Sequence, residues 1–344
     1  MNFNIFLSGL IFLILILFFI SGCLRFQENK IRMPGQQFSG PGGSDYAYGK
    51  VIKSVYGDGA QEYWIFEPDS PRPPSAPLIL FIHGWGAMNP QSYGAWIDHL
   101  VRKGNIVVYP RYQKSLRTPP QEFVPQVLSS FKSALETLRT KGSIRADVEK
   151  FAIVGHSMGG IISANVAALS SSSHLPHVKA LMIIEPGKTE SLIKRSTLAL
   201  EDLSKISLPL FLLVVVGDED KVVGDSDAKK IFQQTINIPL EKKNYVVVHS
   251  DRYGSLELVA NHISPAAPDT DYDSGIMEKF EVDGFENVDT LDYYGYWKLF
   301  DGLTDCAFYE RNCEYALGNT PEQRFMGYWS DGTPLRELTV KIII

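Results

Sequence analysis

The sequence of 344 residues lacks the patterns that mark several common classes of binding site. It contains no long run of lysine or arginine, and its net charge of −6 argues against a general nucleic-acid binder. A His-Glu-x-x-His pattern and a glycine-rich phosphate loop are both absent, so we expect no metal site and no cofactor. No internal repeat occurs, and the length suits one large domain or two smaller ones.

Cysteine is scarce, with three residues in the whole chain, and the first of them follows a long, apolar and uncharged segment. Residues 5–20 carry no charge, and Ile20-Ser21-Gly22-Cys23 follows directly, which is typical of a secretory signal. These four residues resemble the lipobox of bacterial lipoproteins, in which the cysteine carries lipid and begins the mature chain. We therefore expect a signal peptide or membrane anchor over residues 1–22, lipidation of Cys23, and an exported, membrane-attached protein.

An uncleaved anchor is the alternative for this segment. The positive charges of Arg25, Lys30 and Arg32 would then favour a domain that stays on the cytoplasmic side. The other two cysteines, Cys306 and Cys313, are an even pair near the C-terminus. They would form one disulfide in an oxidising compartment, and unpaired buried cysteines are the alternative.

The remaining chain alternates between strand-like and helix-like segments. Residues 23–45 become rich in glycine and proline and predict a flexible tether, so the folded domain is expected over 46–344. Strand-like runs lie at 51–56, 61–67, 78–83, 105–110, 151–155, 180–185, 210–216 and 244–249. Helix-length segments lie at 93–103, 120–141, 158–171 and 226–236. This alternation predicts an α/β domain with a mostly parallel, eight-stranded sheet and helices on both faces, whose active site lies at the carboxyl ends of the strands.

One short segment joins a buried strand to a helix of small residues. Gly155-His156-Ser157-Met158-Gly159 has the pattern Gly-x-Ser-x-Gly, which places a nucleophile on a sharp, strained turn. Because of this strand-to-helix context, the segment resembles the nucleophile turn of the α/β-hydrolase superfamily, and within it the cutinase-like and dienelactone-hydrolase-like esterases. The resemblance implies an α/β-hydrolase fold with Ser157 as the nucleophile, and a plain structural turn is the alternative.

The resemblance also implies where the acid lies, because the superfamily has the chain order Ser, acid, His. Residues 217–223, which follow a predicted strand, resemble the family pattern Gly-x-x-Asp-x-x-Val and place the acid at Asp220. The neighbouring carboxylates of Asp218 and Glu219 are alternatives. Glu185, at the end of the preceding strand, is a further candidate.

Two histidines follow Asp220 in the chain and are therefore candidates for the base, His249 and His262. His262 lies in a loop that resembles the Ala-x-His-x-x-Pro region of related esterases, so the resemblance implies that it is the base. A loop position also allows an imidazole to reach a serine on another strand. His249 ends the last predicted strand, where a capping role is the alternative, and His156 is expected to be structural.

Backbone amides complete the expected site. The resemblance implies an oxyanion hole made by the amide of Met158 and that of Trp85, which lies in the loop after a buried strand. The ring of Trp85 could also form a wall of the substrate pocket, whereas a buried aromatic residue beside turn-forming glycines is the alternative. Tyr112 lies near the mouth of the site by topology and is a second candidate for the pocket.

An acidic, turn-rich insertion follows His262 at about 264–288. Asp269, Asp271 and Asp273 alternate within it as in a calcium loop, but the glycine spacing differs from that of an EF-hand, so a solvated acidic loop is the stronger interpretation. A helix is expected in the apolar region after it. The short connection after Glu185 leaves room for only a minimal cap, which predicts an open active site.

Together these residues predict a serine hydrolase that cleaves carboxylic esters through an acyl-enzyme and uses Ser157, His262 and Asp220. The expected partners are a small or polymeric ester substrate and a membrane reached through the N-terminal lipid or anchor. No nucleic acid is expected. A serine peptidase and an acyltransferase with the same three residues are the alternative enzymes, and a non-catalytic binding protein is a third possibility.

Overall fold

The structure is a computed structural model that describes residues 31–189, 197–276 and 287–343. Contacts divide the chain into two compact units, residues 1–32 and 33–344, and the elements described below belong to the second. The signal or anchor segment and Cys23 lie outside the described residues, so both stay predictions. Among the described residues, no helix combines the length and the apolar character that a membrane span requires.

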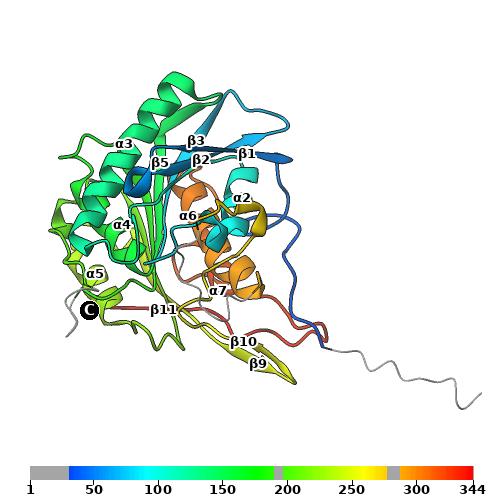
Figure 1. Cartoon of the computed structure of the whole chain (residues 1–344). Helices are drawn as coiled ribbons and strands as arrows, with labels where there is room; N and C mark the ends of the chain where they lie inside the picture. Colours follow the sequence, from blue (N-terminus) through cyan, green and yellow to red (C-terminus); the bar gives the residue numbers. More distant parts are fainter. Residues whose placement is uncertain (1–30, 190–196, 277–286, 344) are drawn as a thin grey trace, which may run out of the picture. The chain divides into compact units, whose positions relative to one another are not determined.

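A nine-stranded sheet forms the centre of this unit (Figure 1). The strands β4, β3, β5, β6, β7 and β8, which are adjacent in this order, run parallel, whereas β1, β2 and β11 pair antiparallel with their neighbours. In spatial order the strands are β1 (Lys50–Tyr56), β2 (Tyr63–Asp69), β4 (Ile106–Pro110), β3 (Ser75–Ile82), β5 (Arg145–His156), β6 (Val178–Ile184), β7 (Phe211–Gly217), β8 (Lys243–Val248) and β11 (Thr339–Lys341). The predicted α/β class is confirmed. The predicted count of eight is wrong, because three residues near the C-terminus add an edge strand.

Helices cover both faces of the sheet, as predicted. Figure 1 shows α3, α4 and α5 on one side and α2 and α6 on the other. The main helices are α2 (Gly94–Arg102), α3 (Phe123–Lys141), α4 (Met158–Leu169), α5 (Ser226–Gln234), α6 (Lys298–Tyr309) and α7 (Pro321–Arg324), and a π-helical segment, η8 (Leu291–Trp297), leads into α6. A two-stranded hairpin is formed by β9 (Asp251–Tyr253) and β10 (Leu256–Leu258). Short 3₁₀ helices are η1 (Gly59–Gln61), η2 (Pro90–Tyr93), η3 (Pro120–Glu122), η5 (Leu203–Lys205), η6 (Leu240–Lys242), η7 (Thr270–Tyr272) and η9 (Cys313–Tyr315).

The core explains why the central strands have continuous apolar sequences. Residues 78–82 of β3 are all fully buried, odd and even positions alike, because helices cover both faces of the sheet. The helix α4 is also buried on every side from Met158 to Ala168. A helix enclosed in this way moves little relative to the sheet, so the residue that precedes it is held firmly.

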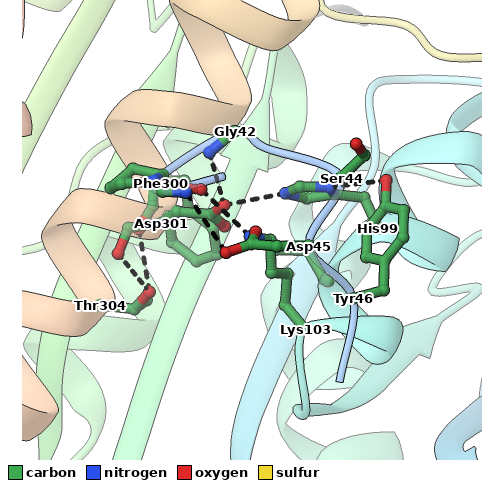
Figure 2. Close-up of polar contacts among 12 residues, drawn as sticks. Gly42, Ser44, Asp45, Tyr46, His99, Lys103, Phe300, Asp301 and Thr304 are labelled. Carbon is green, nitrogen blue, oxygen red and sulfur yellow. Dashed lines mark hydrogen bonds and ion pairs between the residues drawn. The ribbon is translucent and has the colours of Figure 1, made fainter. Parts of the chain in front are cut away.

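An N-terminal strap, residues 34–46, packs on the sheet side that carries α2 and α6 (Figure 2). Asp301 Oδ2 in α6 accepts a hydrogen bond from the Gly42 amide at 2.8 Å and lies 2.8 Å from His99 Nε2 in α2. The Tyr46 hydroxyl lies 3.2 Å from His99 Nδ1. The prediction of a flexible tether over 23–45 is therefore wrong for residues 34–45, because they are hydrogen-bonded to the domain.

Glycine in the strap serves close packing. Gly42 has a φ of +77°, and a Cβ added there would lie 2.1 Å from the carbonyl oxygen of Tyr293. Composition alone could not distinguish this role from flexibility, because glycine is permitted in both settings.

The insertion after His262 also packs on the domain where it is described. The Ala267 amide donates to Ser92 O at 3.1 Å, and Ala267 O accepts from the Ala95 amide at 3.0 Å. Two of its carboxylates accept hydrogen bonds. Asp269 accepts from the Asp271 amide within a turn at 2.9 Å, and Asp273 accepts from the Asn89 side chain of a distant segment at 2.6 Å. The three aspartates are not among the described residues whose ligand atoms converge as a metal site requires. Asp271 and Asp273 are exposed, which agrees with a solvated acidic loop, whereas residues 264–267 are buried against the domain.

The C-terminal region contains the predicted helix, α6, and a disulfide between Cys306 and Cys313. Both cysteines lie at the end of α6 and the start of η9, so the bond closes the turn between these two elements.

Lys298, the first residue of α6, is buried at 1% exposure. Its Nζ donates to the carbonyls of Gln323 and Phe325, and burial lowers the pKa of this lysine to about 7. Because the unfolded chain keeps the proton up to its ordinary pKa of 10.5, burial of the charge destabilises the fold below about pH 7. This penalty is relieved as the pH rises from 7 toward 10.5.

We therefore expect the difference in the free energy of unfolding, wild type minus Lys298→Met, to increase by about 1.4 kcal/mol per pH unit between pH 7 and 9.5. Denaturant titrations at several pH values measure this difference. The exposed Lys132→Met is the matched control and should differ from the wild type by a constant amount. A pH-independent difference for Lys298→Met would contradict the assigned pKa.

Candidate active site

Ser157 stands on a sharp turn between β5 and α4. Its φ of 56° and ψ of −124° are strained for a residue with a side chain, and such strain is typical of functional positions. The flanking glycines permit the turn. A Cβ on Gly155 would lie 2.1 Å from Ser163 Oγ, and a Cβ on Gly159 would lie 2.1 Å from the carbonyl oxygen of Ile82. The glycines therefore allow strand and helix to meet closely while the turn presents the serine.

Ser157, His262 and Asp220 form a continuous hydrogen-bonded chain. Ser157 Oγ lies 2.8 Å from His262 Nε2, and His262 Nδ1 lies 2.9 Å from Asp220 Oδ2. Asp220 follows β7, and His262 lies in the loop after β10. These contacts join residues 105 and 42 positions apart in the sequence. An imidazole held between a hydroxyl and a carboxylate is the arrangement that activates a serine.

Asp220 is held in the ionised state. Burial pushes its pKa upward, but the hydrogen bond and charge of His262 outweigh burial, and the net pKa is lowered. The amides of Val222 and Val223 also donate to Asp220 Oδ1, at 2.8 and 3.0 Å. Two amides and one imidazole thus fix the carboxylate in a single orientation, so that it can orient His262 in turn.

The sequence alternatives Asp218 and His249 pair with each other. Their Oδ2 and Nδ1 atoms lie 2.8 Å apart, and His249 Nε2 lies 2.8 Å from Thr339 Oγ1 in β11. Ser250 and Arg336 also donate to Asp218. Glu219 binds Arg252 at the surface, at 2.7 Å. These residues are therefore engaged in contacts other than those that join Ser157, His262 and Asp220.

Glu185 is a second carboxyl group beneath His262. It follows β6, is completely buried, and its Oε2 lies 3.6 Å from His262 Nδ1, which is beyond hydrogen-bond range. Burial, and after it the charge of Asp220, raises the pKa of Glu185 well above its usual value. Its Oε1 accepts from the Tyr296 hydroxyl at 3.4 Å. Of the two carboxyl groups, Asp220 makes the shorter contact with the imidazole.

His156 supports the loop that carries His262. Its Nε2 lies 2.8 Å from the backbone oxygen of His262, and its Nδ1 lies 2.7 Å from the Tyr93 hydroxyl. Burial, together with the charge of His262, lowers the pKa of His156 to about 3, so the ring is neutral. A neutral imidazole donates from Nε2 to the carbonyl and accepts at Nδ1 from the tyrosine. The expected structural role of His156 agrees with these contacts.

The loop after β3 runs alongside the serine. A Cβ on Gly84 would lie 3.3 Å from Ser157 Cβ, and the next residue, Trp85, is 37% exposed. Met158 begins α4, so its amide belongs to the first turn, where amides have no partner within the helix. Both residues proposed for an oxyanion hole therefore lie beside the nucleophile.

Tyr112 does not line an open pocket, so the prediction that it does is wrong. The side chain is fully buried, stacks on His83 with ring centroids 4.2 Å apart, and donates to the His83 carbonyl at 2.9 Å. Its φ of 40° turns the side chain inward beneath the loop that begins at Gly84. Tyr112 therefore supports the loop from below.

Sequence reasoning missed two tyrosines that join this site to the rest of the fold. Tyr93, in η2, contacts His156, and its hydroxyl also accepts from the Gly84 amide at 3.2 Å. Tyr296, in η8, lies 2.6 Å from Ser264 Oγ and donates to Glu185. Neither tyrosine belongs to a recognisable motif, and their contacts with His156, Ser264 and Glu185 join residues 32 or more positions apart. Only the folded chain identifies them.

Comparisons with known proteins agree with this architecture. A family model named Chlorophyllase, an α/β-hydrolase family, matches residues 59–217. A protein of Acanthamoeba polyphaga mimivirus named "Putative alpha/beta hydrolase" is 23% identical over 141 residues, which are 39% of this chain and 40% of that protein. This chain has the α/β-hydrolase fold. Its match to the viral relative spans less than half of either chain. The family match contains Ser157 and Glu185 but ends before Asp220 and His262.

Proposed function

We propose that this α/β hydrolase cleaves carboxylic esters through an acyl-enzyme on Ser157. The observation that carries the proposal is the chain of contacts from Ser157 Oγ through His262 to Asp220, at 2.8 and 2.9 Å, beginning at a strained turn. A hydroxyl in this setting can lose its proton to the imidazole as it attacks a carbonyl carbon. The α/β-hydrolase fold and the family match support the same chemistry.

In the proposed mechanism, Ser157 Oγ forms a bond to the ester carbonyl carbon while His262 Nε2 takes its proton. Asp220 holds Nδ1–H of His262 and stabilises the imidazolium that results. The amides of Met158 and Trp85 stabilise the negative oxygen of the tetrahedral intermediate. His262 then protonates the leaving alcohol, and the carbon–oxygen bond of the ester breaks.

Water completes the cycle in the same way. His262 takes a proton from a water molecule as it attacks the acyl carbon, and a second tetrahedral intermediate forms. His262 then returns the proton to Ser157 Oγ, which frees the carboxylic acid. Every group in this sequence belongs to the chain, the substrate or water.

Hydrolysis of p-nitrophenyl esters from acetate to palmitate tests the proposal. We expect release of p-nitrophenol and modification of Ser157 by a fluorophosphonate, seen as a mass increase on the peptide that contains it. Amino-acid p-nitroanilides and an added alcohol acceptor are included as controls. Cleavage of the anilides alone would favour a peptidase. Ester turnover that requires the acceptor would favour an acyltransferase, and a folded protein inactive toward all three would overturn the proposal.

A further inference from the structure

Three potential metal ligands converge behind the proposed catalytic histidine. Among the described residues, His156, Glu185 and His262 are the group whose ligand atoms all lie within 4.8 Å of one another. Glu185 Oε2 lies 3.6 Å from His156 Nε2 and 3.6 Å from His262 Nδ1. Each side chain comes from a different segment, at the ends of β5 and β6 and in the loop after β10.

One atom of this cluster is unsatisfied. Glu185 is 0% exposed, and its Oε2 is a buried oxygen without a hydrogen-bond partner. A buried polar atom without a partner costs free energy, so native proteins rarely retain one. This oxygen lies equally far from the two ring nitrogens, and an ion placed among the three atoms would satisfy it.

We propose that His156, Glu185 and His262 form an inhibitory site for a zinc-like transition-metal ion. Two imidazoles and one carboxylate are a ligand set that zinc prefers, whereas magnesium and calcium prefer oxygen ligands alone. Tetrahedral zinc spaces neighbouring ligand atoms about 3.4 Å apart, close to the 3.6 Å that separates Glu185 Oε2 from each ring nitrogen. The nearby carboxylate of Asp220 would help to balance the charge of the ion.

Metal binding would release the proton of the buried Glu185 carboxyl group to solvent and would move two further protons. His262 Nδ1 must be free of hydrogen to bind the ion, so its proton moves to Nε2 and the hydrogen bond to Asp220 breaks. His156 likewise gives up its bond to the His262 carbonyl, and its proton moves to Nδ1 beside the Tyr93 hydroxyl. With hydrogen on Nε2, His262 cannot take the proton of Ser157. The metal-bound protein is therefore inactive.

Calorimetric titration of the full-length, metal-free protein with zinc chloride tests the binding step without reference to activity. We expect one ion per chain, and we expect cobalt(II) at the same site to give the intense visible absorption of tetrahedral coordination. Zinc should abolish ester hydrolysis in parallel with binding, and a chelator should restore it. Failure to bind one ion, or a cobalt spectrum typical of six oxygen ligands, would overturn the proposal whatever the variants show.

Variants locate the ion. Glu185→Gln keeps the size of the side chain and should weaken zinc binding about 10- to 100-fold or more. His249→Gln removes a histidine beside Asp218 outside the site and should bind zinc as the wild type does. Sensitivity to His249→Gln alone would assign the ion to the surface and overturn the proposal.

The inhibitory effect rests on the proposed function, but binding does not. Ser157→Ala should therefore bind zinc as the wild type does, although it is inactive. Binding without inhibition would reject the proposed role of His262 and keep the metal site. Ester hydrolysis without binding would keep the enzyme and reject the site.

Discussion

Replacing Ser157 by alanine is expected to lower kcat/KM for p-nitrophenyl esters by about 10⁴-fold or more. The side chain removed is the one that would form the acyl-enzyme, and no other described hydroxyl is hydrogen-bonded to His262. The fold should remain, because the exchange removes one oxygen and the strained turn is held by its glycines and by the buried helix α4. Initial rates with purified protein, together with circular dichroism spectra, measure both effects.

Ser172→Ala is the matched control for this variant. Ser172 is exposed, and its hydroxyl donates only to the Leu169 carbonyl at 3.0 Å, so the control should keep full activity. A Ser157→Ala protein that is folded and retains more than about 1% of wild-type kcat/KM would show that another nucleophile acts. The role proposed for Ser157 would then be wrong.

Replacing Asp220 by asparagine is expected to lower kcat by about 10³- to 10⁴-fold, because the amide no longer selects the tautomer that Ser157 requires. Glu185→Gln should cost no more than about tenfold, since at 3.6 Å its carboxyl group makes no hydrogen bond to His262 Nδ1. Both exchanges preserve side-chain size, so the comparison separates charge from packing. Measurement of kcat for the two variants with the same ester decides which of the two carboxyl groups acts as the acid.

A larger loss of kcat in Glu185→Gln than in Asp220→Asn would assign the acid to Glu185. That outcome is a serious alternative, because the family match contains Glu185 and ends before Asp220. Asp218→Asn serves as the control for the charge of a nearby carboxylate. Asp218 pairs with His249 and not with His262, so this variant should retain most of the activity.

The sequence predicted the sheet well because burial on both faces produces an unmistakable pattern. Every strand from β3 to β8 contains a buried apolar run, and each predicted run overlaps a strand of the structure. The strand β11 is only three residues long and lies at the edge, where one side is solvated, so no comparable pattern marks it. Length and burial decided which strands could be predicted.

Choosing among rival residues required the fold. Asp218 and Asp220 are two positions apart just after β7, and the sequence favours Asp220 only through its resemblance to a family pattern. The structure separates them through their partners, because the loop that carries His262 contacts Asp220 whereas His249, after β8, contacts Asp218. Hydrogen-bond direction depends on backbone geometry, which composition and spacing do not specify.

Tyr112 shows that topology predicts where a residue lies but not the direction of its side chain. The residue follows β4 at the expected end of the sheet, but a positive φ directs its ring inward beneath His83. The sequence indicates the end of the sheet to which a residue belongs, and it does not indicate which way that residue faces. The sequence also marked Glu185 as a candidate acid, but it could not show that one oxygen of this side chain is buried without a partner.

The N-terminal strap also imposes an order on the making of the protein. The hydrogen bond between Gly42 and Asp301 joins residues 259 positions apart. A ribosome therefore synthesises the strap early and its partner helix late. The strap can dock only after almost the entire domain has been synthesised. Contacts of such long range close slowly and form only after more local structure exists. The first part of the domain to be made is thus among the last to fold.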